Sequence, residues 1–197
     1  MEKKEKLTKK FWIIVLLISV IIISLLITGI VVHLNRKPTI ITKTENGGEV
    51  KLNYTTNSNK YILTDIVPTK DDEGKKLTGD EKVYNFSVSS KLKKSNSITY
   101  EISIDKITEK SNLNDSDIKV YLEKEDSGTY NSILKPTKYS PIKKKTEVGT
   151  KDGMVITKQT VSKNTTDNYR LRIWLSETSK SVSGNYAVEV NINAIAK

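Results

Sequence analysis

Residues 98–105 read Ile-Thr-Tyr-Glu-Ile-Ser-Ile-Asp, and every second side chain in this stretch is apolar. Successive side chains of a β-strand point to opposite faces of a sheet, so the pattern predicts a strand with one buried and one solvated face. Four other stretches alternate in the same way: 84–88, 118–122, 169–175 and 186–194. Shorter apolar runs predict further strands at 50–54, 61–67, 130–134 and 154–161.

Turn-forming residues separate these stretches, at Gly74, Asp126-Ser127-Gly128, Asp152-Gly153 and Ser183-Gly184. Beyond residue 32, no apolar stripe at helical spacing interrupts the strand pattern. About seven to nine short strands with polar alternate faces are typical of an antiparallel sheet protein. We therefore predict a mainly β fold, an antiparallel β-sandwich that is either immunoglobulin-like or a jelly-roll.

The segment from Phe11 to Val32 contains no charged residue. At about 1.5 Å per residue, a helix of this length reaches about 33 Å and crosses a hydrocarbon core of about 30 Å. A signal peptide has a shorter apolar region and a small-x-small cleavage site, which Ile27-Thr28-Gly29 matches poorly. The segment therefore predicts one uncleaved N-terminal transmembrane helix that contacts membrane lipid.

Positive charges on the two sides of this segment predict its orientation. Five lysines precede it, whereas Arg36, Lys37 and Lys43 follow it, so the positive-inside rule places the N-terminus in the cytoplasm. The expected organisation has four parts: a cytoplasmic basic tail at 1–10, the membrane helix at 11–32, a linker at 33–48 and an extracellular β-sandwich domain at 49–197.

The formal net charge is +10 and the chain has no cysteine. The positive side chains are nearly all lysines, whereas bidentate recognition of bases and phosphates favours arginine, so nucleic acid is a disfavoured partner. Lysine-rich surfaces attract polyanions, which makes an anionic cell-envelope polymer a candidate partner. A displayed domain without disulfides fits the surface of a Gram-positive cell.

The residues offer little support for catalysis. The one histidine, His33, lies at the membrane exit, which excludes a Ser-His-Asp triad and histidine zinc sites within the domain. Asp126-Ser127-Gly128 matches the short aspartic-protease signature, but it occurs once and has the composition of a hairpin turn. Ser90 and Lys93 have the Ser-x-x-Lys spacing without the helix that it requires. We predict no catalytic, cofactor-binding or metal-binding residues.

Two acidic clusters, at 71–81 and 112–117, lie in predicted loops. Calcium prefers several oxygen ligands on a flexible loop, but neither cluster has EF-hand spacing. Solvated turn residues are the favoured interpretation, and calcium binding is the alternative.

A row of Arg170, Arg172 and Trp174 occupies the face opposite Tyr169, Leu171 and Ile173 in its predicted strand. These residue types are enriched at interface hot spots, so the row is a possible interaction surface. In the favoured alternative, a loop covers Trp174 and an arginine stacks on it. The densest basic patch of the domain, Lys143, Lys144 and Lys145, is a second possible interaction surface.

The stretches 84–88 (Tyr-Asn-Phe-Ser-Val) and 168–175 (Asn-Tyr-Arg-Leu-Arg-Ile-Trp-Leu) resemble Gram-positive surface proteins of the camelysin and TasA type. In that group an N-terminal hydrophobic segment precedes a β-sandwich, and its members are usually cleaved by a dedicated signal peptidase. Phe11–Val32 departs from that group because it has the features of an uncleaved anchor. The resemblance implies no catalytic or metal-binding residues for this chain.

The expected function is a single-pass cell-surface module that contacts a protein or a cell-envelope polymer. The resemblance adds a biofilm or fibre matrix subunit as an alternative. A carboxylate-dependent hydrolase is the less favoured third possibility.

Overall fold

The computed structural model describes residue 24 and residues 39–43, 48–54, 58–93, 97–142, 148 and 153–196. The chain divides into two compact units, Met1–Arg36 and Lys37–Lys197, and every named strand belongs to the second. Apart from Ser24, the predicted membrane helix at 11–32 lies outside the described residues. Within the part of the chain that is described, no helix is long and apolar enough to cross a bilayer.

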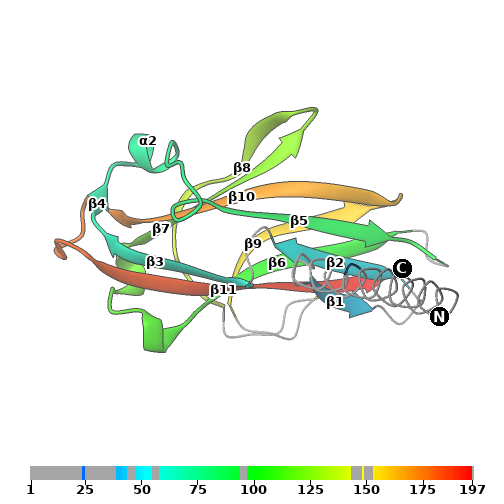
Figure 1. Cartoon of the computed structure of the whole chain (residues 1–197), viewed down its shortest axis with the longest axis horizontal. Helices are drawn as coiled ribbons and strands as arrows, with labels where there is room; N and C mark the ends of the chain where they lie inside the picture. Colours follow the sequence, from blue (N-terminus) through cyan, green and yellow to red (C-terminus); the bar gives the residue numbers. More distant parts are fainter. Residues whose placement is uncertain are drawn as a thin grey trace, which may run out of the picture. The chain divides into compact units, whose positions relative to one another are not determined.

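The strands of the second unit form two sheets (Figure 1). The seven-stranded sheet has the order β1-β2-β5-β10-β7-β8, with β4 pairing β10 beside this path. Its strands are β1 (Thr39–Lys43), β2 (Glu49–Tyr54), β4 (Pro68–Thr69), β5 (Tyr84–Lys91), β7 (Ile118–Asp126), β8 (Thr129–Lys138) and β10 (Thr165–Ser176). The four-stranded sheet has the order β3-β11-β6-β9. Its strands are β3 (Lys60–Ile66), β6 (Ile98–Lys106), β9 (Met154–Val161) and β11 (Gly184–Ala196).

In the described connections, three short helical turns join these strands. They are α2 (Asp71–Gly74), η1 (Thr108–Lys110) and η2 (Asp115–Asp117). All of the strand pairs are antiparallel except β4 with β10, which is parallel. The predicted mainly β, antiparallel class is therefore confirmed.

One apolar core receives side chains from both sheets. In β6 the alternate residues Ile98, Tyr100, Ile102 and Ile104 are fully buried. In β10 the residues that face this core and are buried in it are Tyr169, Leu171, Ile173 and Leu175. Burying one such side chain contributes about 1.5–3 kcal/mol, so the alternation read from the sequence is what holds the sheets together.

The nine strands predicted from alternation and apolar runs all form, but the predicted linker needs a correction. Residues 39–43, placed in a linker at 33–48, form β1 and pair with β2. The sequence of β1, Thr-Ile-Ile-Thr-Lys, is rich in β-branched residues that favour strands. The short elements β4 and α2 were also not predicted, because two and four residues carry too little periodicity to detect.

Candidate functional site: the outer face of the seven-stranded sheet

The outer face of the seven-stranded sheet, turned away from the core, has two different ends. At one end, which we call the covered end, α2 and the chain that follows it lie over the last residues of β10. At the other end, uncharged polar side chains and three basic side chains of β2, β5 and β10 line the surface. We call this second region the polar shelf. Its members are Lys51, Asn53, Asn85, Ser87, Ser89, Lys91, Thr166, Asn168 and Arg170.

Strand register arranges the polar shelf in rows that cross three strands. Ser89 of β5 lies opposite Lys51 of β2 and opposite Thr166 of β10. Hydrogen bonds link the neighbouring hydroxyls, since the oxygens of Ser89 and Thr166 are 3.0 Å apart. Asn53 donates from Nδ2 to the Oγ of Ser89 at 3.4 Å. The result is a regular surface of hydroxyl and amide groups with one face open to solvent.

The next row replaces the lysine and the threonine by two asparagines. Asn53 and Asn168 flank Ser87 on its two sides. The Nδ2 of Asn168 donates to Oε2 of Glu125 at 2.7 Å, which fixes the amide on the β7 side of the sheet. An asparagine side chain both donates and accepts hydrogen bonds. This row can therefore bond to a ligand hydroxyl group whether that group acts as donor or as acceptor.

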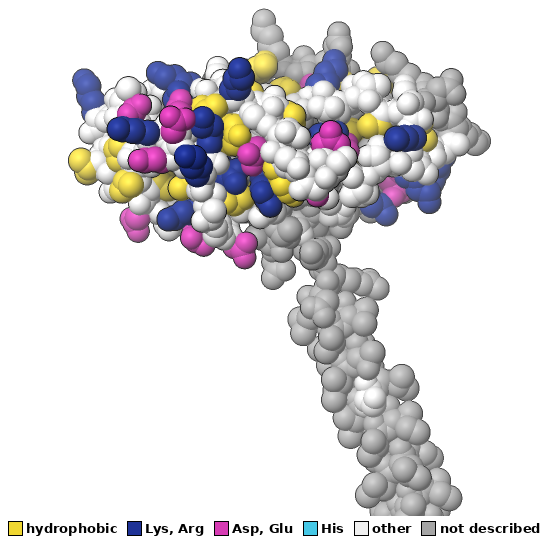
Figure 2. Space-filling view, turned by 90° about the horizontal axis from the view of Figure 1, so that it is seen from above, with side chains coloured by type: hydrophobic (Ala, Val, Ile, Leu, Met, Phe, Trp, Pro, Cys, Tyr) yellow, Lys and Arg dark blue, Asp and Glu magenta, His cyan; other side chains and the backbone are white. Residues whose placement is uncertain are grey.

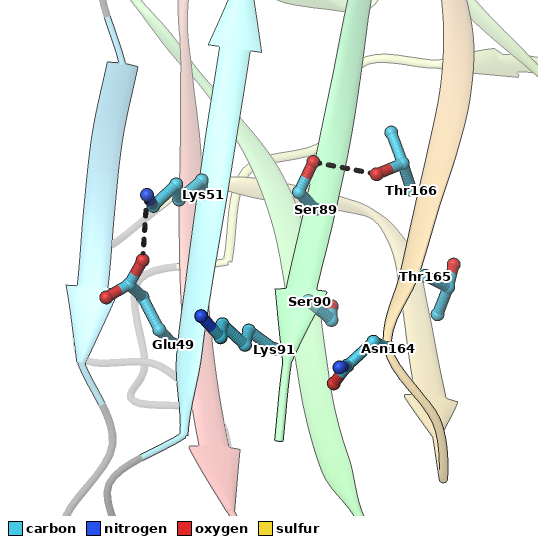
Figure 3. Close-up of a pocket in the computed structure, with 8 residues that line it drawn as sticks. All are labelled: Glu49, Lys51, Ser89, Ser90, Lys91, Asn164, Thr165 and Thr166. Carbon is cyan, nitrogen blue, oxygen red and sulfur yellow. Dashed lines mark hydrogen bonds and ion pairs between the residues drawn. The ribbon is translucent and has the colours of Figure 1, made fainter. Parts of the chain in front are cut away.

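A depression of about 370 Å³ lies at the cationic end of the shelf (Figure 3). Lys51 and Lys91 line it, and Figure 3 shows Lys91 reaching from β5 toward β2. The Nζ of Lys51 is 2.9 Å from Oε1 of Glu49. Ser90 also lines the depression, is only 4% exposed, and has an Oγ without a hydrogen-bond partner.

A second depression of about 210 Å³ lies near the other end of the shelf. It is lined by Asn53, Asn85, Ser87 and Asn168, and by the half-buried aromatic ring of Tyr130 from β8. The guanidinium carbon of Arg170 is 3.5 Å from the centre of that ring, which is cation–π geometry. Asn85 and Lys91 of β5 are six positions apart in the strand, which separates the two ends of the shelf by about 20 Å.

The covered end contains two of the three residues of the predicted Arg-Arg-Trp row. Trp174 is 1% exposed and Arg172 is 6% exposed. Gly74 of α2 packs against the indole so closely that an added Cβ would clash with its ring atoms. The Nε of Arg172 donates to the carbonyl oxygen of Leu77 at 2.8 Å, and its Nη1 pairs with Glu123.

The structure therefore divides this row between the two ends. Trp174 and Arg172 lie under the segment that begins with α2, so Trp174 is covered as in the favoured alternative. Arg170 belongs to the open polar shelf, and the ring on which it stacks is Tyr130 and not Trp174. Gly74 was identified in the sequence as a turn residue, but nothing there indicated that it covers an indole. The other predicted surface, Lys143, Lys144 and Lys145, lies outside the described residues and stays a prediction.

The turn considered for catalysis and the first acidic cluster considered for calcium binding both have structural roles. Asp126-Ser127-Gly128 forms the β7–β8 hairpin turn, in which Ser127 and Gly128 have φ values of 52° and 84°. Asp71 and Asp72 form ion pairs with Lys119 and Lys75. Among the described residues, no group of three or more His, Cys, Asp or Glu side chains could hold a metal ion.

No protein-family model, curated protein or solved structure matches the chain. The polar shelf itself offers three kinds of contact: lysine charges at one end, hydroxyl and amide groups along its length, and an aromatic ring near the other end. Such groups bind ligands by hydrogen bonds, charge and ring stacking.

Proposed function

We propose that the chain is a single-pass, membrane-anchored cell-surface module whose β-sandwich domain binds an anionic, hydroxyl-rich cell-envelope polymer on the polar shelf. The observation that carries this proposal is the combination of two lysines with rows of serine, threonine and asparagine on one open sheet face. Whether the sandwich is immunoglobulin-like or jelly-roll does not change this argument, because either type leaves a sheet face open.

Each part of the polar shelf matches one feature of such a polymer. Hydroxyl and amide side chains at fixed strand spacing can bond to repeated hydroxyl groups. Lys51 and Lys91 can contact a phosphate or carboxylate of the polymer, and Glu49 holds the Lys51 ammonium in place before binding. The residues that follow the anchor carry a formal net charge of +7, the +10 of the chain less +3 in the cytoplasmic tail, and this charge attracts polyanions over a longer range.

The anchor places the polar shelf where the polymer is. The uncharged segment from Phe11 to Val32 and the lysines before it support a cytoplasmic N-terminus and an outward domain. Trypsin added to intact cells should then digest the β domain, which is rich in lysine. Protection of the domain in intact cells, with digestion after lysis, would show the opposite topology.

The shelf is tested by binding of a purified teichoic-acid-like phosphodiester polymer to the full chain in lipid nanodiscs. A variant with Lys51→Gln and Lys91→Gln should bind roughly tenfold more weakly, since two ion pairs of about 0.7 kcal/mol each are removed. The matched control carries Lys60→Gln and Lys158→Gln, two exposed lysines of the four-stranded sheet, and should bind like the parent.

Salt provides the second criterion. Screening of exposed charges should weaken binding by the parent chain as the salt concentration rises, and the shelf variant should show a smaller dependence. Equal losses in the shelf and control variants would leave only nonspecific attraction to a basic protein. Binding that ignores salt would exclude the charge contacts altogether.

A further inference from the structure

The seven-stranded sheet has a gap on one side of β10, close to the covered end. Pairing of β10 with β5 ends at Leu171 opposite Tyr84, and pairing with β4 begins at Leu175 opposite Pro68. Residues 172–174 of β10 therefore have no paired strand on this side within the described chain. Figure 1 shows β4 and β5 as separate segments next to β10.

A pocket of about 190 Å³ lies at this gap. Ile173 and Trp174 of β10 line it together with Leu63 of β3 and Leu77. The indole of Trp174 is 1% exposed, and its Nε1 has no hydrogen-bond partner. A buried N–H without an acceptor is unfavourable, so a ligand that brings an acceptor into this pocket gains a bond that the free protein lacks.

The rim of the pocket is apolar on one side and acidic on another. Ile62 and Val67 are 41% and 54% exposed, so the rim presents two large aliphatic side chains to solvent. Asp65 and Glu81 also line the pocket, and Lys82 is the one cation among its lining residues. In a chain with a net charge of +10, this rim favours a positively charged partner.

The neighbouring elements are suited to an extended peptide. β3 is an edge strand of the four-stranded sheet, and residues 172–174 of β10, which pair with β7 on one side, have no paired strand on the other side within the described chain. Extended peptides bind at such places through main-chain hydrogen bonds, and pockets for alternate side chains give specificity. The pocket has room for one apolar side chain and the adjoining peptide group.

We propose that this pocket binds an extended peptide segment of a partner protein. An apolar side chain of the peptide enters between Ile62 and Val67, and a peptide carbonyl accepts a hydrogen bond from Nε1 of Trp174. A Lys or Arg next to the apolar residue faces Asp65 and Glu81. This site is separate from the polar shelf and does not depend on polymer binding.

The test follows the indole N–H of Trp174 by NMR in the ¹⁵N-labelled full chain, held in lipid nanodiscs. The chain has two tryptophans, so Trp12→Phe leaves one indole signal to observe. The first probe is N-acetyl-isoleucyl-lysine amide, and it should shift this signal in a saturable manner. N-acetyl-glycyl-lysine amide, which lacks the apolar side chain, should bind at least roughly tenfold more weakly.

Charge is tested with N-acetyl-isoleucyl-glutamate amide, which should bind more weakly than the lysine probe by a margin that shrinks with added salt. Equal binding of both isoleucine probes at low salt would overturn the assigned peptide chemistry. A signal that does not move with any probe would mean that the indole is satisfied by a bound water only, and the proposal would fail.

Rim variants locate the site. Val67→Asp, at an exposed rim position, should abolish the shift by the lysine probe while the rest of the spectrum is retained. Val182→Asp is the matched control, because Val182 is 83% exposed and does not line the pocket. Loss of the shift in both variants, or in neither, would contradict the assignment. The Lys51→Gln and Lys91→Gln variant should bind the peptide normally, so failure of the polymer proposal would leave this one standing.

Discussion

The two ends of the outer face of the seven-stranded sheet share strand β10 but differ in what lies over it. At the covered end, α2 and the following chain enclose Trp174 and Arg172. At the polar shelf, Thr166 and Asn168 of the same strand are exposed. Figure 2 shows basic and acidic side chains side by side at the end where α2 lies. Whether the outward-facing residues of a strand are buried or exposed thus depends on the segment that lies over them. The alternation pattern alone does not specify that segment.

The largest expected effect is at the covered end. Trp174→Ala removes a fully buried indole, and we expect the free energy of unfolding to fall by about 3–5 kcal/mol. Urea unfolding of the full chain measures this, with Asn168→Ala on the polar shelf as the control within about 0.5 kcal/mol. A Trp174→Ala variant that keeps its stability yet loses a binding activity would return this residue to the interaction surface.

A substitution at Gly74 tests how tightly α2 packs on Trp174. Gly74→Ala places a Cβ against the indole ring of Trp174, and overpacking of this kind costs about 1–3 kcal/mol. The neighbouring Glu73→Ala, at an exposed position in α2, should change the unfolding free energy by less than about 0.5 kcal/mol. Equal stabilities for the two variants would show that α2 does not pack firmly on Trp174.

A buried polar cluster under the polar shelf gives the third prediction. The Tyr100 hydroxyl donates to Oδ2 of Asp167 at 2.5 Å and lies 2.6 Å from that of Tyr169. The pKa of Tyr100 is raised well above its ordinary value of about 10. Burial of the hydroxyl is the larger cause, and the electrostatic effect of Tyr169 is the second. The folded protein therefore resists its deprotonation. The stability that this phenol contributes is complete below about pH 10 and is lost as the pH rises above that value.

Tyr100→Phe keeps the ring and removes the titrating hydroxyl. We expect the free energy of unfolding to fall by about 1 kcal/mol at neutral pH, because Asp167 loses a donor. The decline of stability between about pH 9 and about pH 11 should become shallower than in the parent chain. Urea unfolding at a series of pH values measures both effects, and an unchanged alkaline decline would assign it to other groups.

The sequence was sufficient to predict nine of the eleven named strands, because burial on one face leaves a period of two. Ile98 to Asp105 illustrates this, since the four apolar residues of that stretch are all fully buried in β6. Arg170, Arg172 and Trp174 show the limit. All three face outward at the same period, but their exposure depends on Gly74 and Leu77, which are about 100 residues away in the chain.

The site shows the same limit. The polar shelf joins residues of β2, β5 and β10 that are far apart in sequence, and none of its serines or asparagines stands out individually in a chain rich in both. The sequence signal that could have been used is the set of polar residues that alternate with the apolar ones in a predicted strand. Asn85, Ser87 and Ser89 lie between Tyr84, Phe86, Val88 and Ser90, so the sequence showed a small, uncharged outer face before the neighbouring strands were known.

The smallest expected effect on stability is on the polar shelf, where the chain provides a matched pair. Ser89 and Thr166 form an exposed cross-strand hydroxyl pair on the seven-stranded sheet, at 3.0 Å. Thr99 and Thr160 form the equivalent pair on the four-stranded sheet, at 2.8 Å. Ser89→Ala and Thr99→Ala should each change the unfolding free energy by less than about 0.5 kcal/mol, because water replaces an exposed partner.

Polymer binding should distinguish these two variants even though their stabilities agree. Ser89→Ala removes an acceptor of Asn53 and a hydroxyl beside Lys51, so the phosphodiester polymer should bind about 2- to 10-fold more weakly. Thr99→Ala should bind like the parent chain, because its hydroxyl pair lies on the other sheet. If both variants bind equally, the Ser89 hydroxyl does not contact the polymer, and lysine charge alone accounts for the affinity.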